Sequence, residues 1–290
     1  MIVAIASGKG GTGKTLVATG LARVAMDLGY QGVSYVDCDV EEPNGHLFLH
    51  PALTSSVEVS VPIPEIDHAL CTYCGRCAQV CAFHALAVIR DQVMVFSELC
   101  HGCGLCASQC PEGAIREVDR HLGTIEFGHV NGMEFAQGTL DVGQAMATPV
   151  IRELKRLAVP AAHDGRLILL DAPPGNACPV VETVRGADVA LLVTEPTPFG
   201  LHDLKIATEV ARDALGVPVA VVINRADRGD QGVEEFCLQE GIPVVLRIPL
   251  DRRIAETYSE GNLWVDSLPE YRPGLKDLAD QLTTVARGTG

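Results

Sequence analysis

The chain is poor in aromatic and basic residues, and it lacks long apolar runs. Aromatic side chains make up 4% of its 290 residues, and 22 lysines and arginines stand against 37 aspartates and glutamates, for a net charge of −15. So acidic a surface repels nucleic-acid backbones and anionic membranes, so we expect no nucleic-acid partner. No stretch reaches the about 18 apolar residues that a spanning helix needs, and we expect no stable membrane insertion.

The N-terminus also lacks the features of a signal peptide. Residues 1–6 are apolar but have no basic start and no cleavage site, so they predict a first strand. Eleven cysteines without a secretion signal favour a reducing compartment and metal ligation over disulfides. We therefore expect a cytoplasmic protein.

Alternating apolar runs and helical stretches predict the fold class. Runs rich in Val, Ile and Leu predict strands buried on both faces at residues 2–6, 33–36, 167–170, 189–193, 217–223 and 244–248. Helical periodicity is found at residues 14–28, 148–157, 201–215 and 233–240. This alternation predicts an α/β protein with a doubly wound, mostly parallel sheet.

One region interrupts this rhythm. Residues 62–127 are rich in cysteine, hold short extended pieces at 87–89 and 93–96, and follow the turn-prone residues 61–64. We predict a small α+β domain at 62–127, inserted into a larger domain made of residues 1–61 and 128–290.

Eight cysteines in this region form two copies of one pattern. Each copy reads Cys-x2-Cys-x2-Cys-x3-Cys, and every cysteine of the second lies 29 residues after its counterpart. This is the spacing of a bacterial two-cluster ferredoxin, in which the fourth cysteine of each run serves the other cluster. It assigns one [4Fe–4S] cluster to Cys71, Cys74, Cys77 and Cys110, and a second to Cys100, Cys103, Cys106 and Cys81.

Two other interpretations of the cysteines stay open. Eight thiolates could make two zinc sites, although zinc knuckles usually have longer gaps between their Cys-x2-Cys pairs, and a disulfide framework is the third reading. Pro111 follows the second run as the ferredoxin pattern requires, whereas Ala82 stands at that place after the first run.

Residues 8–15 read Gly-Lys-Gly-Gly-Thr-Gly-Lys-Thr and match the phosphate-binding pattern G-x4-G-K-[ST] between a predicted strand and a predicted helix. The glycines allow backbone N–H groups to turn inward around phosphates, and the helix N-terminus adds positive charge. We predict a nucleotide site formed by Gly10, Gly11, Thr12, Gly13, Lys14 and Thr15, with Lys14 on the phosphates and Thr15 on Mg²⁺.

The early lysine, Lys9, makes this loop resemble the deviant Walker A motif of the MinD/ParA/Mrp and nitrogenase-iron-protein family. The resemblance implies an ATP-hydrolysing homodimer in which Lys9 reaches the partner's phosphates. Asp37-Cys38-Asp39 resembles the family's switch I and Asp171-Ala-Pro-Pro-Gly175 its switch II. It further implies that Asp37 supports the Mg²⁺ shell and Asp39 orients the attacking water.

The resemblance also assigns Asp171 to the water shell of Mg²⁺ and Gly175 to the γ-phosphate. Asn224 would read the adenine edge and Arg225 would stack on the ring. Residues 248–251, including Pro249 and Asp251, resemble the loop beside the base.

These patterns suggest an ATPase, as a homodimer or paralogous heterodimer, that gates electron transfer from two clusters to a redox partner. An Mrp-type cluster carrier and a MinD-type positioning ATPase are the alternatives. For the last, the apolar spacing at residues 275–285 favours a core-packed helix, because its polar face lacks the basic residues of a membrane anchor. Cys178 lies where the nitrogenase iron protein has a cluster ligand, but a buried structural thiol is the expected role.

Overall fold

A nine-stranded sheet forms the centre of this computed structural model, which describes residues 1–161 and 165–288. The strands lie in the order β11-β10-β9-β1-β8-β2-β7-β6-β3, and those from β11 to β7 run parallel. The parallel strands are β1 (Ile2–Ala6), β2 (Gly32–Asp37), β7 (Met133–Leu140), β8 (Arg166–Asp171), β9 (Val189–Thr194), β10 (Val219–Asn224) and β11 (Val244–Ile248). The predicted α/β fold with a mostly parallel sheet is thus confirmed.

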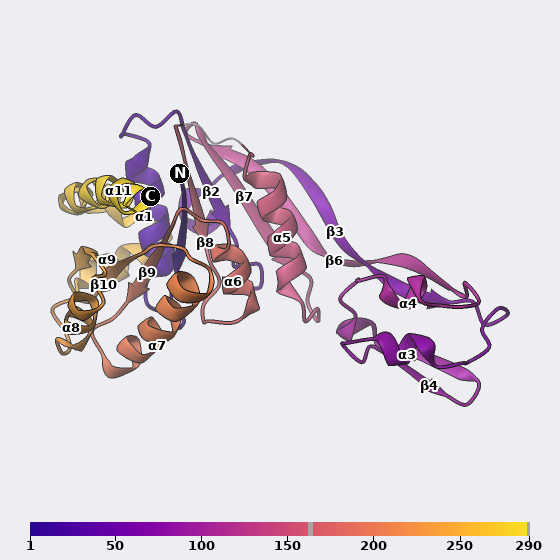
Figure 1. Cartoon of the computed structure of the whole chain (residues 1–290). Helices are drawn as coiled ribbons and strands as arrows, with labels where there is room; N and C mark the ends of the chain where they lie inside the picture. The colour runs from indigo at the N-terminus through magenta and orange to yellow at the C-terminus, as the bar shows by residue number, and fades with distance from the viewer. Residues whose placement is uncertain (162–164, 289–290) are drawn as a thin grey trace.

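Helices cover both faces of the sheet (Figure 1). On one face lie α5 (Ala147–Ala158), α6 (Cys178–Val184), α7 (Pro198–Thr208) and α8 (Gly232–Gln239). On the other lie α1 (Lys14–Ala25), α9 (Arg252–Ser259), α10 (Trp264–Ser267) and α11 (Arg272–Arg287), with the short turn η3 (Pro269–Tyr271) between the last two.

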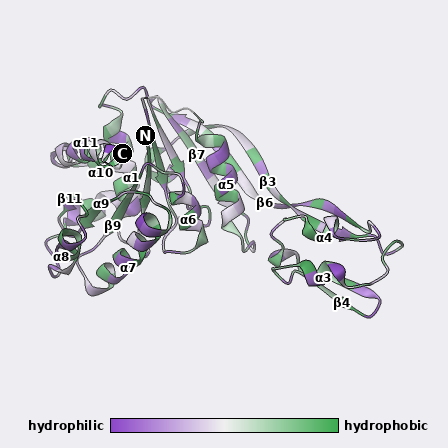
Figure 2. Cartoon of the chain, in the orientation of Figure 1, coloured by the Kyte–Doolittle hydropathy of each residue, from purple (hydrophilic) through white to green (hydrophobic). Residues whose placement is uncertain are grey.

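The central strands are apolar throughout because each side chain meets one of these two helical layers. In β1, Ile2, Ala4 and Ala6 pack into the core under α5 to α8, whereas Val3 and Ile5 pack into the core under α1 and α11. Figure 2 shows this concentration of apolar residues along the strands. The carboxyl ends of parallel strands meet at one edge of such a sheet, where ligands bind.

Two long antiparallel strands, β6 (Ile115–Val130) and β3 (Ala52–Ile66), complete the sheet and extend beyond it (Figure 1). Pairing shifts register between Val59 and Ser60, where Leu122 is the extra residue of β6. We call the paired residues beyond this bulge, 60–66 and 115–121, the arm. Residues 61–64, expected to favour a turn, instead continue β3. Because β3 is the edge strand, the nitrogen atoms of its prolines can face the open side of the strand, where no N–H donor is needed.

The arm carries a small lobe, residues 67–114, at its far end. The lobe contains α3 (Arg76–Val80), α4 (Leu105–Ser108), the 3-10 turn η1 (Ser97–Leu99) and a hairpin of β4 (Leu86–Ile89) and β5 (Gln92–Val95). The 29-residue repeat recurs in space, because α3 and α4 follow the equivalent left-handed glycines Gly75 and Gly104. The domain limits predicted at 62 and 127 fall inside β3 and β6, so the chain passes between the two parts within continuous strands.

Two helical segments bear on other predictions. The helix expected at residues 201–215 ends at Thr208 and continues as a π-helical turn, η2 (Glu209–Ala214). In α11 the side chains of Leu275, Leu278 and Leu282 are fully buried, so the core-packed final helix is confirmed. Among the helices in the described ranges, none has the length and apolarity required to cross a bilayer.

Candidate functional site

The phosphate-loop residues connect β1 to α1 at the carboxyl edge of the sheet. Gly11 and Gly13 take positive φ angles of 76° and 96°, which an L side chain rarely adopts. Gly13 is the N-cap of α1, so the loop ends at a helix N-terminus, where N–H groups are free for an anion. Lys14 and Thr15 follow it and are buried to 7% and 8% exposure.

Asn224, at the end of β10, supports this loop from behind. Its Nδ2 donates to the Thr12 carbonyl oxygen at 2.8 Å, and its Oδ1 accepts from the Arg225 backbone N–H at 2.9 Å. A Cβ on Gly13 would lie 2.5 Å from the same Nδ2, so the close approach requires glycine. The amide that the resemblance assigns to adenine therefore bonds protein groups in this structure.

Two carboxylates lie side by side next to the loop. Asp37 and Asp171 are paired in register at the ends of β2 and β8, and Asp171 Oδ1 lies 3.7 Å from Lys14 Nζ. Asp171 Oδ2 accepts from the Tyr35 hydroxyl at 2.8 Å, whereas within the described ranges its buried Oδ1 has no hydrogen-bond donor. An unsatisfied buried carboxylate oxygen beside a phosphate loop fits the water shell of a magnesium ion.

Asp37 is held by the backbone that follows it. Its carboxylate accepts N–H groups from Asp39, Asn44 and Gly45 at 2.8 to 3.1 Å. Burial, and then repulsion from Asp171, raises the pKa of Asp37 to about 8. Burial also raises the pKa of Asp39 to about 6, although Lys14 opposes this shift. The site thus binds a proton near neutral pH that a divalent cation would have to displace.

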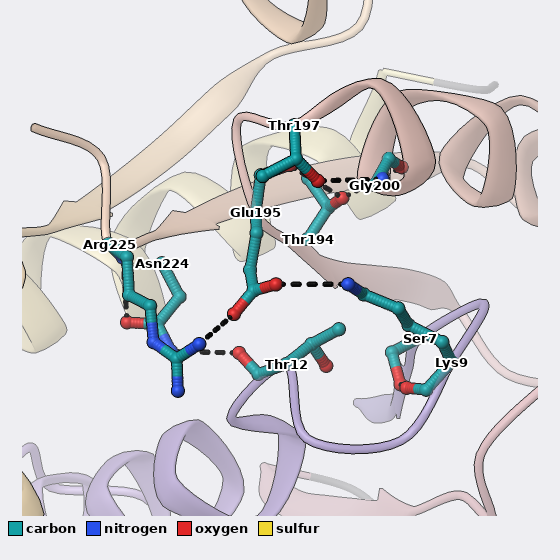
Figure 3. Close-up of polar contacts among 9 residues, drawn as sticks. All are labelled: Ser7, Lys9, Thr12, Thr194, Glu195, Thr197, Gly200, Asn224 and Arg225. Carbon is teal, nitrogen blue, oxygen red and sulfur yellow. Dashed lines mark hydrogen bonds and ion pairs between the residues drawn. The ribbon is translucent and has the colours of Figure 1, made fainter. Parts of the chain in front are cut away.

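Lys9 does not reach toward this centre. Its Nζ lies 3.0 Å from Oε2 of Glu195, which follows β9, and Oε1 of the same carboxylate lies 2.5 Å from Arg225 Nη1 (Figure 3). One glutamate therefore joins a phosphate-loop cation to a cation at the end of β10.

A pocket of about 260 Å³ opens beside the loop, and we call it the Tyr258 pocket. It brings together several predicted residues from separate parts of the chain. The lining residues are Gly11, Gly13, Leu16, Asn224, Arg225, Pro249, Leu250, Asp251, Ile254, Ala255 and Tyr258.

Helix α9 forms one wall of this pocket. Asp251 is its N-cap, and its carboxylate also binds Arg253 at 2.6 Å and the Tyr271 hydroxyl at 2.9 Å, which lowers the pKa of Asp251 to about 2. Tyr258 stacks on Phe48 with ring centroids 4.3 Å apart. Since Phe48 belongs to α2 (His46–Leu49), the pocket wall contacts the short helix that follows the segment resembling switch I.

The segment resembling switch II lies next to the loop as well. Gly175 has a φ of 97°, and its N–H donates to the Ser7 carbonyl oxygen at 3.0 Å. Three residues later, Cys178 begins α6 and is exposed, not buried as expected, whereas Cys38 and Cys237 are buried. Cys178 lies in neither of the cysteine pockets of the lobe.

The lobe holds two small pockets, each lined by four cysteines. The distal pocket contains Cys71, Cys74, Cys77 and Cys110, and it lies against Ile66 and Ile115 at the tip of the arm. The proximal pocket contains Cys81, Cys100, Cys103 and Cys106, and it lies against Pro62 and Pro64, nearer the sheet. In both, three cysteines come from one run and the fourth from the other.

Backbone N–H groups point at the sulfurs of these pockets. Ala85 donates to Cys81 Sγ and its repeat counterpart Ala114 donates to Cys110 Sγ, both at 3.3 Å, and Tyr73 donates to Cys71 Sγ at 3.4 Å. Such bonds stabilise thiolates and tune the potential of an iron–sulfur cluster. The N–H donors and the four cysteines of each pocket therefore fit such clusters.

The two other cysteine interpretations find less support. All eleven cysteines lie in the described part of the chain, and each is free. Within residues 1–161 and 165–288, no three His, Cys, Asp or Glu side chains converge closely enough to hold a single metal ion. A [4Fe–4S] cluster is a larger group, whose four cysteines bind different iron atoms.

Sequence reasoning missed Glu195 and Tyr258. Neither belongs to a glycine-rich or cysteine-rich motif, and each reaches the site through the tertiary fold. The only signal for Glu195 was a carboxylate directly after a buried strand, at the sheet edge where ligands bind.

Comparisons with known proteins agree with this fold. Residues 3–264 match the model of the CobQ/CobB/MinD/ParA nucleotide-binding domain. Two uncharacterized proteins of Methanocaldococcus jannaschii, MJ0578 and MJ0579, are each 30% identical, covering 97% and 90% of this chain and 96% and 90% of their own lengths. The septum site-determining protein MinD of Pyrococcus horikoshii, solved with Mg-ADP, has a TM-score of 0.59 at 20% identity, over all of this chain and 98% of its own. The chain therefore belongs to the CobQ/CobB/MinD/ParA family of nucleotide-binding domains.

Proposed function

We propose that this protein is an ATPase whose nucleotide-dependent switch controls electron transfer through two [4Fe–4S] clusters in residues 62–127. The observation that carries the proposal is the division of eight cysteines between two pockets of four. Each pocket takes three cysteines from one run and the fourth from the other run. When bound, each cluster would supply one-electron transfer.

The nucleotide half of the proposal assigns a role to each residue beside the loop. Lys14 and the loop N–H groups would bind the phosphates, and Thr15 and Asp37 would hold Mg²⁺, with Asp171 binding its waters. Asp39 orients the attacking water. Arg225, Pro249 and Asp251 flank the adenine in the Tyr258 pocket, with Asn224 fixing the loop.

Contacts between the switch and the arm support the coupling. The Val40 carbonyl oxygen, one residue after Asp39, accepts from Leu140 N–H at 2.7 Å, and Asp141 N–H donates to the Leu122 oxygen at 2.9 Å. His121 Nε2 lies 3.2 Å from Asp141 Oδ2. Because Leu122 is the bulge at which the arm leaves the sheet, a displacement of switch I would be transmitted to the start of the arm.

An EPR redox titration tests this coupling. We expect Mg-ATP to shift the midpoint potential of the proximal cluster relative to Mg-ADP, because the arm strands that line its pocket start at Leu122, which is linked to the residue after switch I through β7 and Asp141. The same titration of the Lys14→Ala variant should give one curve with either nucleotide. Identical midpoints and partner-reduction rates in the wild type with and without ATP would remove the coupling and leave a simple ATPase.

Magnesium binding is expected to release a proton. The pKa of Asp37 is raised to about 8, so its carboxyl is protonated in the free protein at neutral pH and must ionise to face the cation. Raising the pH from about 6 to about 8 therefore tightens Mg²⁺ binding, by at most about tenfold per unit. Calorimetry in two buffers of different ionisation enthalpy measures the release, and equal heats in both buffers would contradict it.

The assembly follows from the same assignment. We propose an ATP-dependent dimer of two copies or of two paralogues, and the second arrangement is suggested by the two M. jannaschii relatives at equal identity. Cross-linking of the wild type with and without Mg-ATP distinguishes a monomer from a dimer.

Two other activities of the family would give different experimental results. A positioning ATPase of MinD type would bind liposomes with ATP, but the apolar face of α11 is already packed in the core. A cluster carrier would lose iron rapidly to an apo-acceptor, whereas four cysteines at each pocket favour retention.

A further inference from the structure

Glu195 lies between two parts of the nucleotide site and belongs to neither motif. Its side chain is 9% exposed, and each carboxylate oxygen holds one cation, Lys9 or Arg225. Lys9 is 35% exposed and Arg225 50% exposed, so both cations can leave the carboxylate, which is the fixed member of the group. The three side chains come from the phosphate loop and the ends of β9 and β10 (Figure 3).

The backbone around Glu195 explains why it is fixed. Its carbonyl oxygen accepts from Thr197 N–H at 2.8 Å, and Thr197 Oγ1 caps α7 by accepting from Gly200 N–H at 3.0 Å. Thr194 Oγ1 donates to the Gly200 oxygen at 3.0 Å. A Cβ on Gly200 would lie 2.2 Å from the Glu195 oxygen, so the turn closes only around glycine. The carboxylate is thus preset by the start of α7.

Because of this placement, a bound nucleotide competes with Glu195 for Lys9 and Arg225. Phosphates attract Lys9, and a nucleobase in the Tyr258 pocket contacts the side of the site from which Arg225 extends. Lys9 can serve a phosphate only after its contact with Glu195 breaks, because one ammonium group cannot remain at 3.0 Å from the carboxylate and also move to a phosphate.

We infer that Glu195 is a positioning residue that retains Lys9 beside the loop until a nucleoside triphosphate displaces it. The inference rests on the proposed nucleotide site. Glu195 would then determine how easily Lys9 is released to bind a phosphate. The inference also accounts for the position of its carboxylate, which contacts Lys9 on the phosphate side of the site and Arg225 on the base side.

The test is a double-mutant cycle on nucleotide binding. Glu195→Gln keeps the shape of the side chain but removes its charge, and we expect a fluorescent, non-hydrolysable ATP analogue to bind the full-length protein about threefold to fivefold more tightly. The same change in a Lys9→Ala background should tighten binding much less, because the retained lysine is gone and only the loss of one negative charge remains. Glu195→Asp, which keeps the charge, should bind nearly as the wild type does.

Removing any acid near phosphates favours binding through charge alone, so a matched control is needed. Asp203→Asn removes one negative charge from α7 beside Gly8, at a residue for which the structure records no bond to Lys9. We expect its effect to be the same with and without Lys9. If Glu195→Gln tightens binding equally in both backgrounds, or weakens it in the wild type, the inference is overturned.

The binding assay separates this inference from the proposed function. A wild type that binds the analogue but neither hydrolyses ATP nor holds iron would contradict the proposed function, and the cycle would still report on Lys9. If the wild type hydrolyses ATP and holds two clusters, but the effect of Glu195→Gln does not depend on Lys9, the proposed function stands and the role of Glu195 is rejected. Melting temperatures of all variants identify any that lose the fold.

Discussion

Replacing Cys110 with alanine is expected to remove the cluster of the distal pocket, although Cys110 is the last cysteine of the second run. The distal pocket is lined by Cys71, Cys74, Cys77 and Cys110, so the variant should leave that cluster with three thiolates. Iron in anaerobically purified protein should fall from about eight to about four atoms per chain. The expectation contradicts a simple division of the chain into one cluster per run.

Double variants identify which cluster is lost. Cys110→Ala combined with Cys74→Ala removes two ligands of the same pocket, so about four irons should remain. Combined with Cys103→Ala, it removes one ligand from each pocket, so almost no iron should remain. Cys81→Ala with Cys103→Ala should again keep about four.

Cys178→Ala is the matched control, since that exposed cysteine lies in neither pocket, and it should leave the iron content unchanged. A loss of iron in this variant would point to a further cluster at the dimer interface. About two irons or zincs per chain in the wild type, without acid-labile sulfide, would reject the cluster assignment for the whole lobe.

The parts of the fold that the sequence predicted depend on local patterns. The strands of the parallel sheet are short apolar runs because both faces are covered, and this pattern can be read residue by residue. The phosphate loop and the grouping of cysteines follow from spacing, because each is built from neighbouring residues or from a repeat.

The parts that it did not predict depend on partners far along the chain. Residues 61–64 contain two prolines and were expected to turn, but pairing with β6 holds them extended. Strand β7 was missed because its sequence, Met-Glu-Phe-Ala-Gln-Gly-Thr-Leu, mixes polar and apolar residues and contains Gly138. A side chain on that glycine would lie 2.7 Å from Val40, a contact that only the folded sheet reveals.

The same division holds within the site. Lys14 was predicted from its motif, but its approach to Asp171 requires strands β1 and β8 to pair. Glu195 and Tyr258 lie 180 or more residues after the loop, and each makes contacts that no local spacing encodes.

Lys14→Ala should abolish nearly all ATP hydrolysis and leave the clusters in place. The Lys14 ammonium is buried to 7% exposure at the loop, where it would face charge that develops on the transferred phosphoryl group. Loss of one preorganised donor at such a place costs about a hundredfold to a thousandfold in turnover. A phosphate-release assay measures this change, and retention of more than about a tenth of wild-type turnover would contradict the assignment.

The design must separate lost chemistry from lost folding, because Lys14 also lies 3.7 Å from the buried Asp171. Removing the ammonium leaves that carboxylate without its cation, which destabilises a buried site. Iron content is the internal control, since the lobe lies at the far end of the arm and its cysteines are untouched. Lys276→Ala, an exposed lysine on α11, is the charge-matched variant and should hydrolyse ATP as the wild type does. A Lys14→Ala protein that keeps its iron and loses turnover would place hydrolysis at the phosphate loop and cluster binding in the lobe, as two separable activities of one chain.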